Sequence, residues 1–278
     1  MAHAHRWRLI EPVNSEPKDL GAELQFQARQ AAQVNVTATP QDVIDRYRHC
    51  RGWRIFRKEY CFKLLHECRP VAVLDFGCGT GESSTELAVL GYAVTGIDVS
   101  PDLIRLAEER ARLDRVAGQA TFLTVDGTNA TLPGQVFDMI LVQAVLHHVD
   151  LPACLETLDR LVKPDGFLLI VEPVAYSRAL QWLRDVTPVE KDLSPNERQL
   201  HRGDLRLIAE RFAIVQRRHF NIVGRLGRFV GDGTRWGVRM WIALQWIDYV
   251  LLHIPGMSYF AGTVVLLCQK RATATPRP

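Results

Sequence analysis

The chain has few cysteines, and none of them is arranged to bind a metal. The six cysteines, at positions 50, 61, 68, 78, 154 and 268, include no C-x-x-C pair and no Cys/His cluster with zinc spacing. We therefore expect no metal site. We also expect free thiols in a reducing compartment, which favours a cytoplasmic protein.

Long apolar runs and a strong charge of one sign are missing as well. No stretch of about 18 apolar residues is present, so no membrane-crossing helix is expected. The first eight residues have no apolar h-region, and we expect no secretory signal. The formal net charge is +3, and the basic residues form no stripe with interleaved aromatics. This pattern disfavours a nucleic-acid partner.

A glycine-rich turn directly after an apolar strand is the most informative feature present. The strand, Val71–Leu74, runs into Asp75, and Gly77, Gly79 and Gly81 follow with G-x-G-x-G spacing. Glycines let the backbone turn sharply and approach a ligand closely, and the next helix directs its first N–H groups toward that ligand. Dinucleotide enzymes instead use G-x-G-x-x-G to hold a pyrophosphate. An acid two residues before the first glycine would repel a pyrophosphate, but it suits an amino group.

Acids also end the next two strands. Asp98 follows the strand at 93–97, about 20 residues after Gly77, where an acid can accept hydrogen bonds from both hydroxyls of a ribose. Ser100-Pro101 is expected to cap and start a helix to residue 113. Asp126 follows the strand at 120–125. A loop Asp is also a common turn former, so both a ligand and a turn interpretation stay open.

The order of these motifs resembles class I S-adenosylmethionine (SAM) methyltransferases, over residues 70–173. The glycine turn resembles their motif I, and Gly-Ile-Asp-Val-Ser-Pro at 96–101 resembles motif II. Phe-Asp-Met-Ile at 137–140, Leu-His-His-Val at 146–149 and Leu-Val-Lys-Pro-Asp-Gly-Phe at 161–167 are similar to the same family, most of all to its ubiquinone/menaquinone-type small-molecule group.

The resemblance implies an α/β, Rossmann-like, doubly wound sheet of seven strands, six parallel and the last antiparallel. The later strands are then expected at 137–142, at 167–171 after a turn at 163–166, at 212–220 and at 262–269. The resemblance further implies SAM as cofactor. The residues that it assigns to SAM are Asp75, Gly77, Cys78, Gly79, Gly81, Asp98, Val99, Asp126, Gly127 and Gln143.

The expected chemistry needs little from the protein, because SAM carries its own leaving group. The protein must supply position, exclusion of water and, for an O–H or N–H acceptor, a base. His147 and His148 follow the fourth strand and Glu172 ends the fifth, where the acceptor must line up. We expect His148 to be the base, with Glu172 as an alternative. The histidine pair could instead make hydrogen bonds at a helix start.

A small, hydrophobic or aromatic molecule is the expected acceptor. The Asp/Asn-Pro-Pro-aromatic box of amine-methylating nucleic-acid enzymes is missing after the fourth strand, where the chain reads Gln-Ala-Val-Leu at 143–146. Two other functions stay open. One is a SAM-using enzyme of different transfer chemistry, and the other is a non-catalytic module that binds a partner or a membrane through 238–252.

We expect four segments. Residues 1–69 form a tail and a helical cap, with helices near 20–32 and 40–67, a break near Gly52 and Thr39 as a cap. Residues 70–220 form the SAM-binding core, which includes a short amphipathic helix around 180–186. Residues 221–261 form a helical insertion between strands six and seven, and 262–278 form the last strand and a tail. The N-terminal helices either cover the mouth of the site or pack on the sheet edge.

The insertion contains a stretch, 238–252, that is apolar around nearly its whole circumference. Only Arg239, Gln245 and Asp248 interrupt it. A helix of this kind is buried, oligomeric or membrane-facing. It either packs on the core or against a second copy in a homodimer, or it forms a lid or a peripheral membrane contact that admits a lipid-like acceptor. Neighbouring arginines and tryptophans suit the second interpretation.

Overall fold

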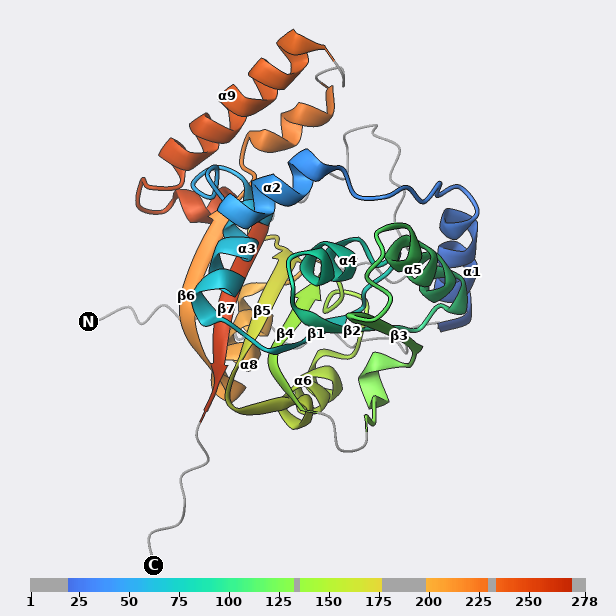
Figure 1. Ribbon diagram of the computed structural model, residues 1–278. Helices are drawn as coiled ribbons and strands as arrows, with labels where there is room; N and C mark the ends of the chain where they lie inside the picture. The colour runs from blue at the N-terminus through green and yellow to red at the C-terminus, as the bar shows by residue number, and fades with distance from the viewer. Residues whose placement is uncertain (1–19, 133–135, 177–198, 230–233, 272–278) are drawn as a thin grey trace, which may run out of the picture.

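A computed structural model describes residues 20–132, 136–176, 199–229 and 234–271 (Figure 1). One sheet of seven strands has the order β3-β2-β1-β4-β5-β7-β6. β7 pairs antiparallel with both β5 and β6, whereas β1 to β5 pair in parallel. The expected Rossmann-like, doubly wound sheet with an antiparallel last strand is confirmed. The strands are β1 (Ala72–Phe76), β2 (Ala93–Asp98), β3 (Ala120–Thr124), β4 (Phe137–Gln143), β5 (Val162–Pro173), β6 (Phe212–Phe220) and β7 (Thr263–Lys270).

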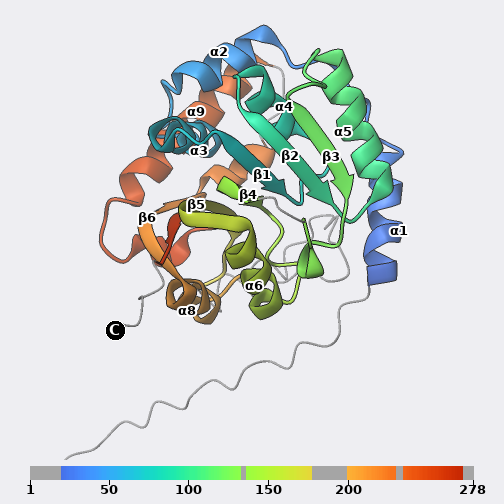
Figure 2. The same ribbon diagram turned by 60° about the horizontal axis from the view of Figure 1, so that its bottom comes forward.

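Helices cover both faces of this sheet, as Figure 2 shows. α3, α4 and α5 lie on one face, and α6 and α8 lie on the other. The amphipathic helix expected around 180–186 lies outside the described residues. The helices are α1 (Leu20–Ala31), α2 (Gln41–His49), α3 (Arg57–Cys68), α4 (Glu82–Val89), α5 (Pro101–Leu113), α6 (Leu151–Leu161), α8 (Arg202–Arg211) and α9 (Arg235–Leu251), with short 3₁₀ turns η1 (Gly127–Asn129), η2 (Gly224–Phe229) and η3 (Met257–Phe260).

The central strands are apolar on both sides because both faces are covered. In β4, Met139 and Leu141 pack toward α3, α4 and α5, while Ile140 and Val142 pack toward α6 and α8. All four side chains are almost fully buried. This packing fixes the sheet, and the carboxyl ends of its parallel strands meet at one edge, where such folds bind ligands.

Two local predictions are wrong. Thr39 does not cap α2, because Pro40 is the N-cap residue and provides no side-chain hydrogen bond. Thr39 instead donates to the Asp114 carboxylate, from its N–H at 2.7 Å and its hydroxyl at 2.6 Å. Residues 163–166 do not precede β5 as a separate turn. They belong to that strand, which pairs from Val162 and contains an irregularity where Asp165 has a φ of 62°.

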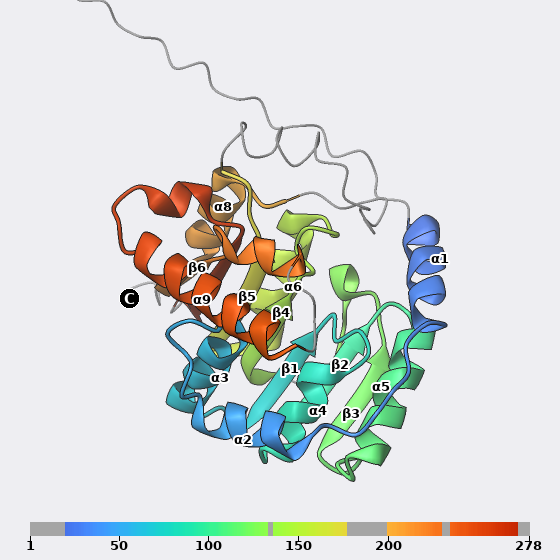
Figure 3. The same ribbon diagram turned by 90° about the horizontal axis from the view of Figure 1, so that it is seen from above.

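The insertion helix α9 lies beyond the carboxyl ends of the strands, on the β6 side of the sheet (Figures 1 and 3). The buried carboxylate of Asp248 attaches it to the segment after β6. This carboxylate accepts hydrogen bonds from the backbone N–H groups of Ile222, Val223 and Gly224 at 3.1, 2.7 and 2.9 Å. Charge-assisted bonds of this kind are about twice as strong as neutral ones.

The burial pattern of α9 is the reverse of that of an ordinary amphipathic helix, because polar residues are buried and apolar ones are exposed. Its buried residues are Gly237, Gln245 and Asp248. Several of its large apolar side chains are exposed instead, and these are Trp236, Val238, Met240, Trp241, Trp246, Ile247 and Val250, of which Trp241 also stacks on Phe56 at 4.8 Å. The fully buried contacts of this helix are therefore made by its polar and small residues, and much of its apolar side stays exposed. Across the described residues, no helix combines the length and the apolar character needed to span a bilayer.

Candidate cofactor and active site

The glycine turn between β1 and α4 is held in place by the end of β2. The N–H groups of Gly77 and Cys78 both donate to the Ile97 carbonyl, at 2.8 and 2.9 Å. The Gly79 N–H donates to Asp98 Oδ2 at 2.9 Å. Because these three N–H groups are used inside the protein, they do not form a cradle for a pyrophosphate. This geometry agrees with the argument made from the G-x-G-x-G spacing.

The glycines of the turn have different roles. Gly77 has a φ of 74°, and a Cβ there would lie 2.3 Å from a methyl carbon of Val145. A Cβ at Gly81 would lie 2.6 Å from the Ala107 Cβ. Gly79 differs from both, because no atom lies within 4 Å of the position that its Cβ would take. The first and third glycines are thus required for packing, and Gly79 borders open space where a ligand can approach the backbone.

Asp98 ends β2 directly beneath this turn. The residue is 8% exposed, and its Oδ1 accepts a hydrogen bond from the Ser100 N–H at 3.0 Å. Ser100 in turn caps α5 as expected, and Val99 lies between the two, half-buried. An ionised carboxylate offers roughly four acceptor sites. A carboxylate at this strand end is the type of group that accepts hydrogen bonds from a ribose diol.

Asp75, the acid before the turn, is buried. Its Oδ2 accepts a hydrogen bond from the Ser84 hydroxyl at 2.6 Å. Burial raises the pKa of this carboxyl to about 6, against the lowering effect of the Ser84 hydrogen bond. Lys58, a nearby cation that lowers this pKa, forms its ion pairs with Glu82 and Glu86 instead. An acid buried in this way next to Asp98 fits a ligand that carries a positive charge, such as the amino group of SAM.

The remaining residues predicted to bind SAM are Asp126, Gly127 and Gln143, and they make contacts within the protein. Gln143 ends β4, and its side-chain amide donates to the Ser83 hydroxyl at 2.9 Å. Asp126 is exposed and caps η1 by accepting from the Thr128 N–H at 2.9 Å, as a turn former does. Gly127 lies so close to the Phe76 ring that a Cβ would meet it at 2.5 Å.

Glu172 is not exposed, although a base would need to reach the acceptor. Its Oε1 accepts hydrogen bonds from the N–H groups of Val145 and Leu146, both at 2.8 Å. Its Oε2 lies 2.6 Å from Nδ1 of His147, which is also buried. This carboxylate therefore organises the turn that follows β4. Sequence reasoning missed the contact, since the partners lie 25 to 27 residues apart.

The same turn positions His148. The first residue of this turn after β4 is Ala144, and its φ of 55° is an unusual conformation for a non-glycine residue. The His148 ring is half-buried, and its centroid lies 4.0 Å from that of His147. The structure thus brings His147, His148 and Glu172 together at the ends of β4 and β5. Of the three, His148 is the more accessible.

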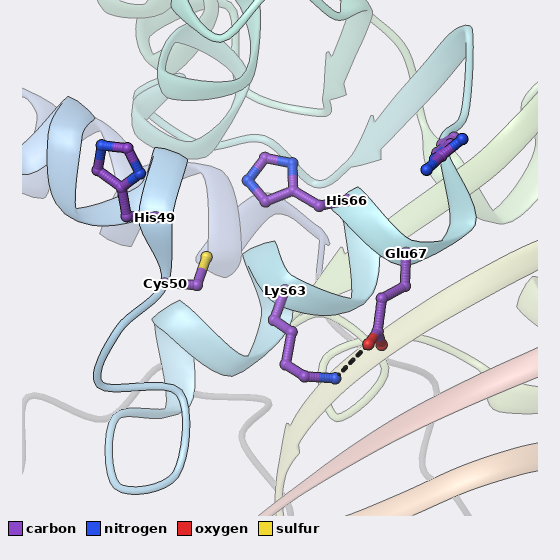
Figure 4. Close-up of a pocket in the computed structure, with 6 residues that line it drawn as sticks. His49, Cys50, Lys63, His66 and Glu67 are labelled. Carbon is purple, nitrogen blue, oxygen red and sulfur yellow. Dashed lines mark hydrogen bonds and ion pairs between the residues drawn. The ribbon is translucent and has the colours of Figure 1, made fainter.

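Two cavities lie apart from these residues. One of about 590 Å³ is lined by His49, Cys50, Lys63, His66, Glu67 and Arg69, near the amino end of β1 (Figure 4). The His66 ring nitrogens there already contact the Tyr92 hydroxyl and the Tyr47 carbonyl. The second cavity, of about 460 Å³, lies between β6 and α9. Within the described residues, no group of His, Cys, Asp or Glu is arranged to hold a metal.

Residues 74–170 match the family described as a methyltransferase domain. A mitochondrial ubiquinone biosynthesis O-methyltransferase of Schizosaccharomyces pombe is 36% identical over 118 residues, which are 42% of this chain and 40% of that protein. A demethylmenaquinone methyltransferase of Tropheryma whipplei is 34% identical over 118 residues, which are 42% of this chain and 47% of that protein. The chain therefore spans less than half the length of these two relatives.

Solved structures show the same fold. The N-methyltransferase NodS of Bradyrhizobium japonicum, in complex with S-adenosylhomocysteine, has a TM-score of 0.53 at 14% identity, over 90% of this chain and all of NodS. A SAM-dependent methyltransferase of Methanosarcina mazei has a TM-score of 0.53 at 24% identity, over 76% of this chain and 98% of that one. The chain therefore shares the fold of these two methyltransferases, and residues 74–170 resemble a methyltransferase domain.

The buried carboxyl of Asp75 predicts an unusual dependence of stability on pH. Its pKa is about 6 in the folded protein, against an ordinary value of 3.8, so its contribution to stability is complete below pH 3.8 and is lost as the pH rises through 6. Asp75→Asn keeps an acceptor for Ser84 but does not ionise. We expect it to raise the free energy of unfolding of the ligand-free protein by on the order of 2–3 kcal/mol near pH 7.5.

Urea unfolding at several pH values checks this expectation. The gain from Asp75→Asn should shrink as the pH falls toward about 4, where the wild-type carboxyl is protonated. Asp102→Asn, on the exposed surface of α5, is the matched control and should change stability little at any pH. A gain that is the same at all pH values would contradict the explanation by burial.

Proposed function

We propose that this protein transfers a methyl group from SAM to a small, hydrophobic or aromatic acceptor. The observation that carries the proposal is the glycine turn, which the end of β2 holds through the Ile97 carbonyl and the Asp98 carboxylate. A site that is organised before its ligand arrives loses little entropy on binding. The turn is also closed to pyrophosphate, which argues against a dinucleotide.

The residues around the turn fit SAM part by part. Gly79 and the buried Asp75 suit the aminocarboxypropyl arm, and Asp98 suits the ribose. Asp126 and Gly127 follow β3, where the adenine would lie, although Asp126 is partly used in its turn. When bound, SAM supplies an activated methyl group together with its leaving group. Orientation of the acceptor and removal of its proton are left to the protein.

His148 is the residue best placed to accept that proton. Histidine titrates near neutral pH, and this ring is accessible at the ends of β4 and β5. Glu172 is a positioning residue, because its two oxygens hold the turn and His147. This distribution favours proton removal by His148 over the alternative of Glu172 as the base.

Quinone-type acceptors are the chemical class that the relatives favour. The names of the two relatives place one in ubiquinone biosynthesis and describe the other as acting on demethylmenaquinone. We extend this class to the present chain as part of the proposal. Transfer of another part of SAM, or binding without catalysis, would also use the glycine turn. Neither of these accounts for the half-buried His148 beside the buried pair of His147 and Glu172.

Asp98→Ala tests the cofactor site. Loss of two charge-assisted hydrogen bonds to a ribose should weaken binding of S-adenosylhomocysteine by on the order of 2–4 kcal/mol in calorimetry. Asp98→Asn retains the shape and should lose less. NADH should not bind the wild-type protein. Unchanged affinity in a folded Asp98→Ala variant would show that the ribose is bound elsewhere.

His148→Ala tests the base. Turnover with phenolic and quinone-type acceptors, measured as release of S-adenosylhomocysteine, should fall about 100-fold or more, the usual contribution of a general base. Affinity for S-adenosylhomocysteine should not change. His49→Ala, at an exposed position far from the strand ends, should retain full turnover. If His148→Ala retains it as well, the proton leaves by another route.

We further propose that α9 rests on a membrane surface, which would place a cytoplasmic protein next to a lipid-like acceptor. Its outward side chains include Trp236, 76% exposed, and Val250, 61% exposed. Arg235 and Arg239 lie on the same helix. Exposed tryptophans and nearby arginines are typical of helices that lie in an anionic lipid interface. Exposed apolar side chains gathered on one helix are typical of an interaction site.

Flotation with vesicles tests this contact. The protein should float with phosphatidylcholine vesicles that contain phosphatidylglycerol, and much less with phosphatidylcholine alone, because the arginines need an anionic surface. Replacing Trp236 and Trp246 by serine should abolish flotation without changing S-adenosylhomocysteine binding. If no vesicle binds, the contact is absent. Sedimentation as a dimer that these substitutions break would then show that α9 faces a second copy.

A further inference from the structure

Arg218, near the end of β6, lies among aromatic rings. Its guanidinium carbon is 4.8 Å from the ring centre of Tyr60, 5.1 Å from Phe220, 5.4 Å from Trp53 and 5.6 Å from Tyr249. The residue is half-buried, so much of its charge is removed from water. Aromatic faces attract a cation, but they do not neutralise it.

No carboxylate pairs with this arginine within the ranges that the structure describes. Its guanidinium donates to two backbone carbonyls only, those of Trp53, at 3.5 Å, and Arg54. The nearest carboxylate on α9, that of Asp248, already accepts three backbone hydrogen bonds. A guanidinium has five N–H donors in a planar fork, so Arg218 has donors left for an acid group.

Arg218 lines the cavity between β6 and α9. The volume of this cavity, about 460 Å³, is within the range of small-molecule sites. Arg54 and Arg217 also line it and add positive charge. His219 adds none at neutral pH, because burial lowers its pKa to about 4. The apolar part of the wall comes from Ile55, Tyr60, Phe220, Tyr249 and Leu252.

The cavity is separate from the cofactor site. The glycine turn follows β1, and the cavity lies at β6, with β4, β5 and β7 between them. Neighbouring strands are about 4.8 Å apart, so the two sites are roughly 19 Å apart along the sheet. A ligand there does not need to contact SAM.

We propose that this cavity binds a small organic anion with an aromatic body. Its acid group would accept hydrogen bonds from the unused donors of Arg218, and its ring would lie against Tyr60, Phe220 and Tyr249. The planar fork of arginine matches a carboxylate or a phosphate geometrically. Arg54 and Arg217, which also line the cavity, favour a negatively charged ligand. The aromatic wall favours an aryl group over a small inorganic anion.

Calorimetry with three probes tests the site on the full chain. Benzoate and phenyl phosphate should bind the wild-type protein, and benzamide, which has the shape of benzoate without its charge, should bind at least tenfold more weakly. Affinity for the two anions should be the same with and without saturating S-adenosylhomocysteine. Inorganic phosphate should bind more weakly than phenyl phosphate, because it lacks the ring.

Variants of Arg218 locate the binding. Arg218→Gln should weaken benzoate binding roughly 10- to 100-fold, as expected for a charged hydrogen bond. Arg218→Lys keeps the charge but loses the fork, so it should be intermediate. Arg105→Gln, on the exposed face of α5, is the matched control. Circular dichroism and S-adenosylhomocysteine affinity should be unchanged in all three.

Three results would overturn the proposal. These are equal affinity for benzoate and benzamide, benzoate binding that Arg218→Gln leaves intact, and no binding of either anion to the wild-type protein at millimolar concentration. The first and third are read on the wild type and do not depend on a variant that folds. None of them bears on SAM binding or methyl transfer, which the calorimetry of Asp98→Ala tests separately.

Discussion

The hydrogen bonds between the glycine turn and the end of β2 are the constraint on which the site depends. The Ile97 carbonyl accepts from Gly77 and Cys78, and the Asp98 carboxylate accepts from Gly79. Together they fix the turn to a neighbouring strand that is buried on both faces. The direction of α4 and the open space at Gly79 both follow from this attachment. The protein pays for this geometry with two buried acids, Asp75 and Asp98, close to each other.

A second carboxylate has the corresponding role at the other half of the site. Glu172 holds the N–H groups of the turn after β4 and orients His147. The turn contains Ala144 in a left-handed conformation, which such bonds stabilise against relaxation. Each half of the site is therefore built from a strand end, a turn with left-handed residues and an acid contributed by the neighbouring strand.

The sequence allows the first half to be predicted but not the second. The glycines and Asp98 can be found because the turn and the strand end are local patterns with a known spacing. The partners of Glu172 depend on the register that pairs Gln143 with Val171, which no local pattern specifies. The contact of Thr39 with Asp114 spans 75 residues, and for this reason a capping role for Thr39 was the natural but wrong expectation.

The orientation of α9 also depends on contacts between residues far apart in the sequence, which no local pattern specifies. Its apolar composition predicts a helix correctly, but not which side faces the protein. Asp248 decides the orientation, because its three backbone partners lie 24 to 26 residues earlier in the chain. An expectation based on composition would turn the apolar residues inward, whereas the polar anchor turns them outward.

This reversed helix has a thermodynamic consequence. The inner side of α9 contributes Gln245, Asp248 and Tyr249 to the wall of the cavity at β6, and its outer side carries the exposed tryptophans. If binding on the outer side favours one position of the helix, it changes the free energy of ligand binding in the cavity on the inner side. By linkage, the reverse effect must have the same size. One helix of 17 residues thus separates two surfaces that any shift of the helix would couple.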